Sequence, residues 1–394
     1  MSEGDHRSHA VQATPCPHWQ PITIAAVEAI PLGARLTTPF RFANVVRTAS
    51  ENVIVRLTST AGICGYGEAC PVPQLTSERG RSIAQLIDLE VAPFLRDAEA
   101  SERLHLLDRV AKSLPNAPFT RAAIDVALLD LVGRTTGLPM HVLIGGRYRD
   151  KIEVHGSVGW SGDTAEMVAS ARAQAELFRV LKLYAGPGSI DEDVKRIEAV
   201  REAVGPGHPF LVDVNGLWTP REACSVGARL KDCGVALLEQ PVSPLDASGQ
   251  RRVAATYEAD FGIDVAADEC VRSPSDVAMV AAEQGATVVN LGMSKLGGPS
   301  AASAAAAVAQ AHRLQIMIGS VIELGVATAA GLHLAASIPT LAYPSYLMGP
   351  LKYHQQVTWP TVEILNGTID VPMGPGLGIE VDNEALTALD LRRA

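Results

Sequence analysis

The chain has 394 residues and a formal net charge of −10 without a basic cluster, which argues against nucleic acids and anionic membranes as partners. Hydrophobic residues make up 47% of it, enough for a well-filled interior, but no apolar run approaches the ~20 residues that cross a membrane. Its six cysteines show no metal-ligand spacing, so we expect free thiols in a reducing cytoplasm and a small-molecule partner.

The first part of the chain predicts a smaller α+β domain. Residues 1–20 have no apolar core and are expected to form a disordered extension. Residues 22–70 alternate strand signals with turns, which is typical of an antiparallel sheet. From about 78 to 137 the pattern is helical, and its last run closes on Gly137 as helices do. We expect residues 21–145 to form this domain.

After residue 145, short apolar runs alternate with helical stretches such as IDEDVKRIEAV and AASAAAAVAQAHR. The runs lie at 154–159, 180–184, 210–214, 236–239, 263–267, 287–291, 315–319 and 341–348. Eight strands that alternate with helices indicate an α/β fold of the (β/α)8 TIM-barrel type, which we place over residues 146–354. The C-terminal segment, residues 355–394, returns to hairpin-like signals and is expected to pack on the first domain.

Three of the predicted barrel strands end in an acid: Asp213 in FLVDVNG, Glu239 in ALLEQP and Asp268 in VAADE. Runs that are apolar on both faces are typical of strands buried in a parallel sheet, so an acid at their end points into the barrel mouth. A single strand-end carboxylate more often caps the next helix. Three at successive strand ends, with no His or Cys beside them, favour a Mg²⁺ site.

A series of short motifs follows the same order and spacing as in a known family. They are GYGEA (65–69), LKLYAG (181–186), DVNG (213–216), EQP (239–241), DE (268–269), KLGG (295–298), GSVIE (319–323) and PGLG (375–378). With them, residues 22–384 resemble the enolase superfamily, and within it the muconate-lactonising subgroup. The resemblance implies an α+β capping domain over the barrel, one essential Mg²⁺, and a homo-oligomer, either a dimer or an octamer.

The resemblance also implies a reaction and its metal ligands. Superfamily members remove the proton α to a carboxylate and form an enediolate that the metal stabilises. Asp213, Glu239 and Asp268 match the metal ligands. The physical chemistry agrees, because the α-proton of a carboxylate is very weakly acidic and a divalent ion placed where charge accumulates supplies several kcal/mol.

The sequence departs from the subgroup at its acid/base positions. The subgroup's second strand ends Lys-x-Lys, whereas this chain has Lys182 and Tyr184. The subgroup's lysine five residues before the Gly-Gly pair is Gly292 here. Lys295 aligns with a different position, so it is kept as a substrate-binding candidate only. Because a two-base proton transfer needs a base on each face of the α-carbon, these changes disfavour a racemase or epimerase.

Amino-acid substrates are also disfavoured. Dipeptide epimerases carry an Asp-x-Asp at the eighth strand to hold an ammonium group, and YPSYLMG (343–349) contains no acid. The mandelate-racemase pattern fails as well, because its Asp near residue 292 and its His after strand seven are both absent.

Tyr184 then becomes a candidate base. On one strand, Lys182 and Tyr184 face the same way at roughly 7 Å. A tyrosine ionised at neutral pH needs a pKa lowered by about 3 units, on the order of 4 kcal/mol. The lysine ammonium offers roughly 2.4 kcal/mol at an effective dielectric near 20, and the metal could add the rest. The alternative is that Tyr184 only fills the space of the subgroup's lysine. Further acid/base candidates near the mouth are His155, Glu323, Lys352 and His354.

Substrate contacts are expected from the segment TPFRFANVVRT, residues 38–48, which occupies the place of the family's mobile specificity loop. Arg41 could meet a second substrate anion, while Phe40 and Phe42 could exclude water or simply pack. Trp160, just past the first barrel strand, is expected to line the same pocket.

These observations predict a Mg²⁺-dependent enzyme that enolises a small carboxylate and completes a one-face β-elimination of water. One base suffices for syn elimination, because its conjugate acid can protonate the leaving group. A cycloisomerase or racemase with bases not recognised in the sequence is the first alternative. The second is a non-catalytic barrel that binds a metal and a carboxylate, against which the three intact acids argue.

Overall fold

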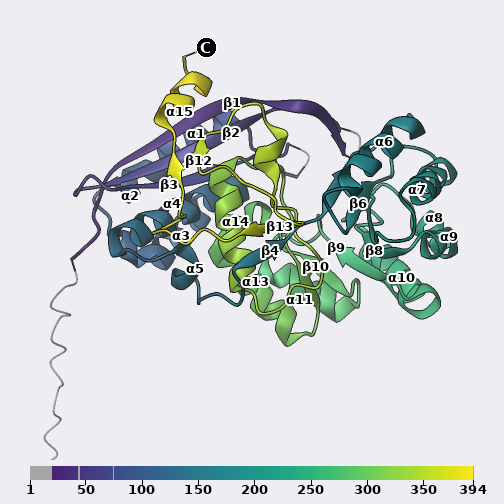
Figure 1. Ribbon diagram of the computed structural model, residues 1–394. Coiled ribbons are helices and arrows are strands. Elements are labelled where there is room, and N and C mark those ends of the chain that lie inside the picture. The colour runs from purple at the N-terminus through teal and green to yellow at the C-terminus, as the bar shows by residue number, and fades with distance from the viewer. Residues whose placement is uncertain (1–19, 43–44, 74, 394) are drawn as a thin grey trace, which may run out of the picture.

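The computed structural model describes residues 20–42, 45–73 and 75–393, without the side chain of Phe42. All but the last residue of the predicted extension, residues 1–20, lies outside these ranges. Within them the chain forms an antiparallel sheet with its helices and a barrel-like parallel sheet beside it (Figure 1). None of the helices in the described part of the chain is long and apolar enough to span a membrane.

The antiparallel sheet has the strand order β1-β2-β3. Its strands are β1 (Ile24–Phe42), β2 (Val45–Ser59) and β3 (Cys64–Ala69). The predicted loop over residues 38–48 is wrong in form, because Phe40 pairs with Arg47 and Arg41 with Val46 in one long hairpin. Its threonine, valine and aromatic residues suit a strand. Figure 1 shows this hairpin reaching from its own sheet across to the barrel.

Helices cover one side of this sheet. They are α1 (Gly80–Leu86), α2 (Ala92–Leu95), α3 (Arg103–Ser113), α4 (Pro118–Thr136) and α5 (Met140–Leu143), with a π turn at Ile87–Val91 and a 3-10 turn at Ala100–Glu102. Helix α4 lies directly on β3, where a Cβ at Gly67 would come 1.8 Å from the carbonyl oxygen of Ala123. The predicted helix end is confirmed, since Gly137 follows α4 with φ 75°.

The barrel strands run parallel in the order β11-β10-β9-β8-β7-β6-β5. They are β5 (Gly156–Val158), β6 (Leu181–Tyr184), β7 (Phe210–Asp213), β8 (Val235–Glu239), β9 (Asp264–Ala267), β10 (Val288–Asn290) and β11 (Gln315–Met317). An apolar cluster that includes Leu211, Leu237 and Met317 joins inward-facing residues of several strands. This packing closes the interior, so a ligand has room only at a strand end.

The predicted eighth strand, residues 341–348, is not a regular strand. The segment still bridges the two sides of the barrel: the amide of Tyr346 donates to the carbonyl of Ile318 at 3.0 Å, and Ser345 pairs with Val154. The proline between Tyr343 and Ser345 has no N–H to donate, which interrupts the ladder. The TIM-type barrel is thus confirmed with one irregular stave.

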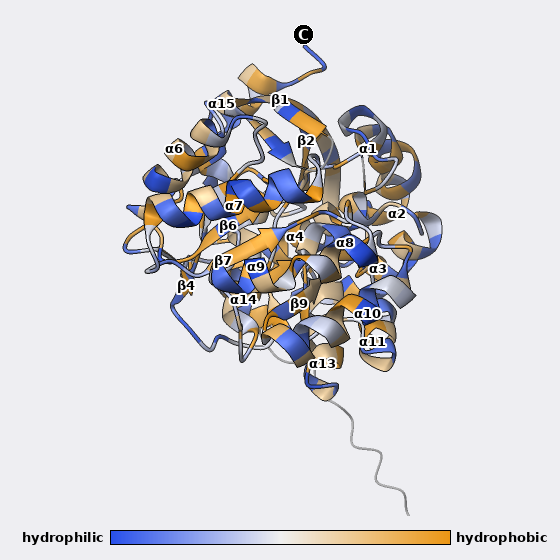
Figure 2. Ribbon diagram, turned by 90° about the vertical axis from the view of Figure 1, so that its right-hand side faces the viewer, coloured by the Kyte–Doolittle hydropathy of each residue, from blue (hydrophilic) through white to orange (hydrophobic). Residues whose placement is uncertain are grey.

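Helices surround these strands. They are α6 (Thr164–Ala175), α7 (Ile190–Val204), α8 (Pro220–Ser225), α9 (Gly227–Asp232), α10 (Ala247–Thr256), α11 (Pro274–Glu283), α12 (Met293–Leu296), α13 (Pro299–Ala311) and α14 (Gly325–Ser337), with a π turn at Tyr257–Phe261 and a 3-10 turn at Gly349–Lys352. In Figure 2, α7 shows many hydrophilic residues, whereas β7 is hydrophobic. Ser189 and Glu192 form a capping box that starts α7.

The C-terminal segment touches both layers. It contains β12 (Thr358–Trp359), β13 (Thr368–Asp370), β14 (Glu380–Val381) and α15 (Asn383–Leu389). Strand β13 pairs with β4 (Lys151–Glu153) at the start of the barrel. Helix α15 lies beside β1, and the amide of Leu391 donates to the carbonyl of Pro31 at 2.9 Å (Figure 1).

Candidate active site

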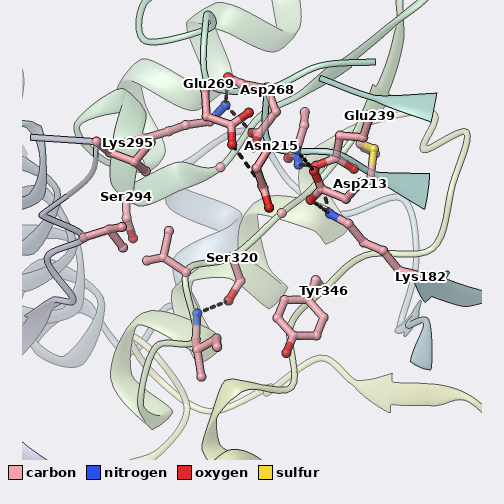
Figure 3. A pocket seen from close by; sticks show the side chains of 18 of the residues that line it. Lys182, Asp213, Asn215, Glu239, Asp268, Glu269, Ser294, Lys295, Ser320 and Tyr346 are labelled. Carbon is pink, nitrogen blue, oxygen red and sulfur yellow. Dashed lines mark hydrogen bonds and ion pairs between the residues drawn. The ribbon is translucent and has the colours of Figure 1, made fainter. Parts of the chain in front are cut away.

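A cavity of about 220 Å³ lies at the carboxyl ends of the barrel strands, and Phe40 of the β1–β2 hairpin forms part of its wall. Asp213 ends β7, Glu239 ends β8, and Asp268 directly follows β9. All three acids line the cavity, and the register of neighbouring strands places Asp213 beside Glu239. The structure therefore brings the three predicted metal ligands to one site (Figure 3).

Two lysine ammonium groups reach these acids. Nζ of Lys182 lies 2.8 Å from Oδ2 of Asp213 and 2.9 Å from Oε1 of Glu239. Nζ of Lys295 lies 2.6 Å from Oδ1 of Asp268 and also donates to the carbonyl oxygen of that residue. Figure 3 shows the two side chains approaching from opposite sides. The cavity thus holds a lysine on each side of the acid cluster.

Gly292 makes room for Lys295. The residue stands at the N-cap of α12 with φ −63°, so its backbone does not require glycine. A Cβ at this position would come 3.1 Å from Cε and 3.5 Å from Cδ of Lys295. The aliphatic part of Lys295 therefore lies over residue 292, in space that a side chain there would occupy.

Two of the strand-end acids of the cavity, Asp213 and Glu239, are buried, and the charges of all three acids act on one another. Burial, followed by repulsion from neighbouring acids, raises the pKa of Asp213 and of Glu239, while Lys182 opposes both shifts. Oε2 of Glu239 is buried without a hydrogen-bond partner in the described structure. Among the described residues, no three His, Cys, Asp or Glu side chains lie close enough together to hold a metal ion as they stand. The carboxylates of Asp213 and Asp268 are paired with Lys182 and Lys295. The all-oxygen donor set nevertheless fits a hard divalent cation.

Tyr184 lines the cavity but does not have the surroundings of a phenolate. Burial raises its pKa well above the ordinary value, and the charge of Lys182 opposes that shift without overcoming it. The ammonium of Lys182 lies over the ring, 5.3 Å from its centroid, and is held by the acids. Phe40 packs edge-on against the same ring at 5.3 Å. The structure thus does not support the predicted tyrosinate, because the ammonium group of Lys182 is paired with the carboxylates of Asp213 and Glu239.

His155 is fully buried in the cavity wall. Its Nδ1 lies 3.1 Å from the carbonyl oxygen of Gly156, and its ring stacks on Tyr346 at 5.4 Å and 14°. Burial, assisted by the charge of Lys182, lowers its pKa to about 3. The imidazole is therefore neutral.

Comparisons with known proteins place the chain in a family. Residues 25–145 match the mandelate racemase / muconate lactonizing enzyme N-terminal domain, and residues 166–385 match the enolase C-terminal domain-like model. The chain belongs to the mandelate racemase / muconate lactonizing enzyme family of the enolase superfamily. The resemblance predicted from the order of motifs is confirmed, and the chain is an enolase-superfamily enzyme. Members of this superfamily generally use a divalent metal.

Relatives match over nearly the whole chain. It is 30% identical to muconate cycloisomerase 1-2 of Acinetobacter lwoffii, over 94% of this chain and 96% of the relative. It is 31% identical to L-Ala-D/L-Glu epimerase of Bacillus subtilis (strain 168), over 90% and 96%. The solved muconate lactonizing enzyme of Pseudomonas fluorescens, complexed with muconolactone, superposes with a TM-score of 0.89 at 30% identity, covering 94% of this chain and all of that one.

The other predicted site residues differ in whether they line the cavity. Glu323 lines the cavity and accepts hydrogen bonds from Oγ of Ser294 at 2.9 Å and from Oγ of Ser320. Lys352 instead lies over the ring of Phe40, 5.7 Å from its centroid, and not in the cavity lining.

Like Lys352, three further predicted residues do not line the cavity. Arg41 is exposed, with its guanidinium 5.0 Å from the ring of Trp160. Nε1 of Trp160 donates to Asp193 at 3.0 Å, which turns the indole away from the site. His354 is exposed, and its amide donates to the carbonyl of Arg35. The side chain of Phe42 lies outside the described residues.

Several polar residues of the cavity were not predicted. Asn290 donates from Nδ2 to Oε1 of Glu239 at 3.0 Å, and Asn215 donates to Oε1 of Glu269 at 3.0 Å. Asn290 ends β10 just as the acids end their strands. The rule that predicted the acids, a polar residue at the end of a barrel strand, could therefore also have identified Asn290.

Proposed function

We propose that this protein is a Mg²⁺-dependent lyase that removes the proton α to the carboxylate of a small substrate and then eliminates water from the same face. The observation that supports it most is that Asp213, Glu239 and Asp268 share one cavity with two lysine ammonium groups. Apolar residues of the wall, among them Phe40, Val72 and Leu75, would limit the access of water to the reacting atoms.

In this proposal the three acids hold Mg²⁺, because carboxylate oxygens are its preferred protein ligands. When bound, the ion supplies positive charge where an enediolate develops negative charge. The ammonium group of Lys182, which lies between Asp213 and Glu239, attracts the substrate carboxylate.

We assign the proton transfer to Lys295, which faces Lys182 across the cavity and is only 6% exposed. In its neutral form, the amine of Lys295 would take the proton from the α-carbon, and the resulting ammonium would return that proton to the β-hydroxyl as the carbon–oxygen bond breaks, which restores the neutral amine. The products are an α,β-unsaturated carboxylate and water. This assignment replaces Tyr184, whose phenol stays protonated.

The test uses the full chain with Mg²⁺ and a panel of small β-hydroxy acids in deuterated water, followed by proton NMR. We expect loss of the α-proton signal and formation of the unsaturated acid for at least one substrate. Lys295→Met should lower its turnover on the order of 10²–10⁴-fold, as for lost general acid–base catalysis. The matched control is Lys195→Met on the exposed face of α7. Full activity of Lys295→Met would contradict the assignment, and carboxylate binding without any exchange would indicate the non-catalytic alternative.

A second candidate is a cycloisomerase or racemase. It is favoured by the position of Lys295 opposite Lys182, which supplies a potential base on each side of the substrate. The names of the relatives, muconate cycloisomerase and L-Ala-D/L-Glu epimerase, agree with it. Recovered substrate decides between the two: retained configuration supports elimination, whereas the deuterated opposite enantiomer would move the assignment to a racemase.

The expected homo-oligomer, a dimer or an octamer, and the cytoplasmic location stay predictions. Light scattering of the purified protein would test the first.

A further inference from the structure

One wall of the cavity presents a hydrogen-bond acceptor that no group of the described residues satisfies. Nδ1 of His155 faces the carbonyl oxygen of Gly156 at 3.1 Å. A carbonyl only accepts, so Nδ1 must carry the ring proton. The other nitrogen, Nε2, is then a lone-pair acceptor, and it is buried without a partner in the described structure.

The surroundings of His155 keep it in this form. The side chain is 0% exposed, and Tyr346 covers one face of the ring. The charged groups that act on it are the ammonium groups of Lys182 and Lys352, which oppose its protonation. A buried acceptor without a donor is costly, so the donor must come from the cavity, as water in the free enzyme and as ligand in the complex.

We propose that the substrate carries an uncharged hydrogen-bond donor, a hydroxyl group, that binds Nε2 of His155 and makes this residue select hydroxy-carboxylates over their deoxy analogues. The inference rests on the proposed function, since it names the substrate class of the same site. A hydroxyl fits better than an ammonium group because the charges acting on His155 are positive.

The other walls indicate the rest of this substrate. Phe40, Val72, Leu75, Met317 and Ile322 line the cavity together with the polar groups, so it would accept an apolar substituent beside the carboxylate and the hydroxyl. A phenylpropanoate skeleton is a suitable probe, since it carries both ends and can be obtained with or without the hydroxyl.

The experiment measures dissociation constants by calorimetry with the full chain and Mg²⁺. The probes are 3-hydroxy-3-phenylpropanoate, 2-hydroxy-3-phenylpropanoate, 3-phenylpropanoate and phenylalanine. We expect at least one hydroxy acid to bind about 10-fold or more tightly than 3-phenylpropanoate and than phenylalanine, as for a ligand that satisfies a buried acceptor. This comparison in the unmodified protein does not depend on any variant folding.

The variant His155→Phe keeps a ring against Tyr346 and removes Nε2, so the preference should fall to below about 2-fold. Ser157→Ala is the matched control: Oγ of Ser157 is also buried and unpartnered, but Ser157 does not line the cavity, and its removal should leave the preference intact. Equal binding of hydroxy and deoxy acids, or a preference that survives in His155→Phe, would overturn this inference and leave the proposed function standing. If no carboxylate binds in the presence of Mg²⁺, the proposed function fails and the inference fails with it.

Discussion

At the scale of single residues, the site is a balance of buried charges. Five carboxylates line the cavity, those of Asp213, Glu239, Asp268, Glu269 and Glu323. Burial together with repulsion from Asp268 and Asp213 raises the pKa of Glu269 well above its ordinary value. Lys182 and Lys295 offset part of this charge. A bound divalent cation would neutralise more of the negative charge of these carboxylates. This is a physical reason for the cluster to bind such a cation.

The first prediction concerns the three acids. Replacing Asp213 or Asp268 by Asn, or Glu239 by Gln, should weaken Mg²⁺ binding by at least about 100-fold, since even outer-shell partners commonly cost 10–100-fold. Calorimetric titration with Mg²⁺ measures this. Asp191→Asn is the control, because this acid is exposed on α7 and pairs with Lys195. Unchanged Mg²⁺ affinity in all three variants would refute the metal site.

The second prediction concerns Tyr184. Because its phenol remains protonated and its ring packs against Phe40, Tyr184→Phe should keep turnover within about 10-fold of the unmodified enzyme. The measurement is kcat against pH on a substrate found by NMR screening. A fall on the order of 10²–10⁴-fold with an intact fold would restore the tyrosinate as the base.

At the scale of elements, α12 decides whether a lysine reaches the cavity. This one-turn helix directly follows β10 and carries Lys295 in its last turn, with Gly297 left-handed behind it at φ 96°. The turn is short, so Lys295 folds back over residue 292 rather than outward. The positions of Gly292 and Lys295 are therefore coupled by packing.

The third prediction tests this coupling. Gly292→Leu should displace Lys295 and lower turnover about as much as Lys295→Met, on the order of 10²–10⁴-fold. Gly292→Ala should have a smaller effect, since its Cβ would be 3.1 Å from a flexible side chain. Gly285→Ala, where the nearest atom would lie 3.6 Å away, is the control. Full turnover in Gly292→Leu, with an unchanged melting temperature, would show that the position of Lys295 is irrelevant to catalysis.

At the scale of the whole molecule, Glu68 joins the two layers. It stands on β3 of the antiparallel sheet and accepts hydrogen bonds from the amides of Leu324 and Ala327, at 2.7 and 2.9 Å, where α14 of the barrel begins. Asn52 donates to it at 2.6 Å. The helix terminus favours a carboxylate, yet burial is the larger effect and raises the pKa of Glu68 to about 7.

The fourth prediction is a pH dependence of stability. A folded-state pKa of about 7, against an ordinary value of 4.5 for a glutamate side chain, means that the folded chain holds the proton more tightly. The contribution of Glu68 to the free energy of unfolding is therefore fully present below pH 4.5 and is lost as the pH rises through 7. The loss amounts to at most roughly 3 kcal/mol. Glu68→Gln cannot titrate, so its free energy of unfolding relative to the unmodified protein should improve between pH 5 and pH 8. Denaturant unfolding at several pH values measures this, and a constant difference would contradict it.

Local patterns in the sequence were sufficient to predict the fold class and the strand-end acids of the candidate site. Periodicity identified the antiparallel sheet, the helix that ends at Gly137 and seven of the eight barrel staves, because alternation and strand ends are local properties of the chain. The positions of Asp213, Glu239 and Asp268 follow from the same rule, since acids at the ends of adjacent parallel strands must meet at one edge. The prediction of a regular eighth strand was wrong because Pro344 interrupts the hydrogen-bond ladder of that segment.

The surroundings of those acids, in contrast, follow from contacts between residues that are far apart in the chain. The alignment gave Lys295 no acid/base role and left it as a substrate-binding candidate, whereas the fold lays its side chain over Gly292 and brings its Nζ to Asp268. Spacing placed Lys182 where it could lower the pKa of Tyr184, but the acids hold its ammonium and burial raises that pKa. The unpartnered nitrogen of His155 is likewise invisible in the sequence. The direction of a side chain, its burial and its partners depend on residues distant in the chain, and these set both its charge and its chemistry.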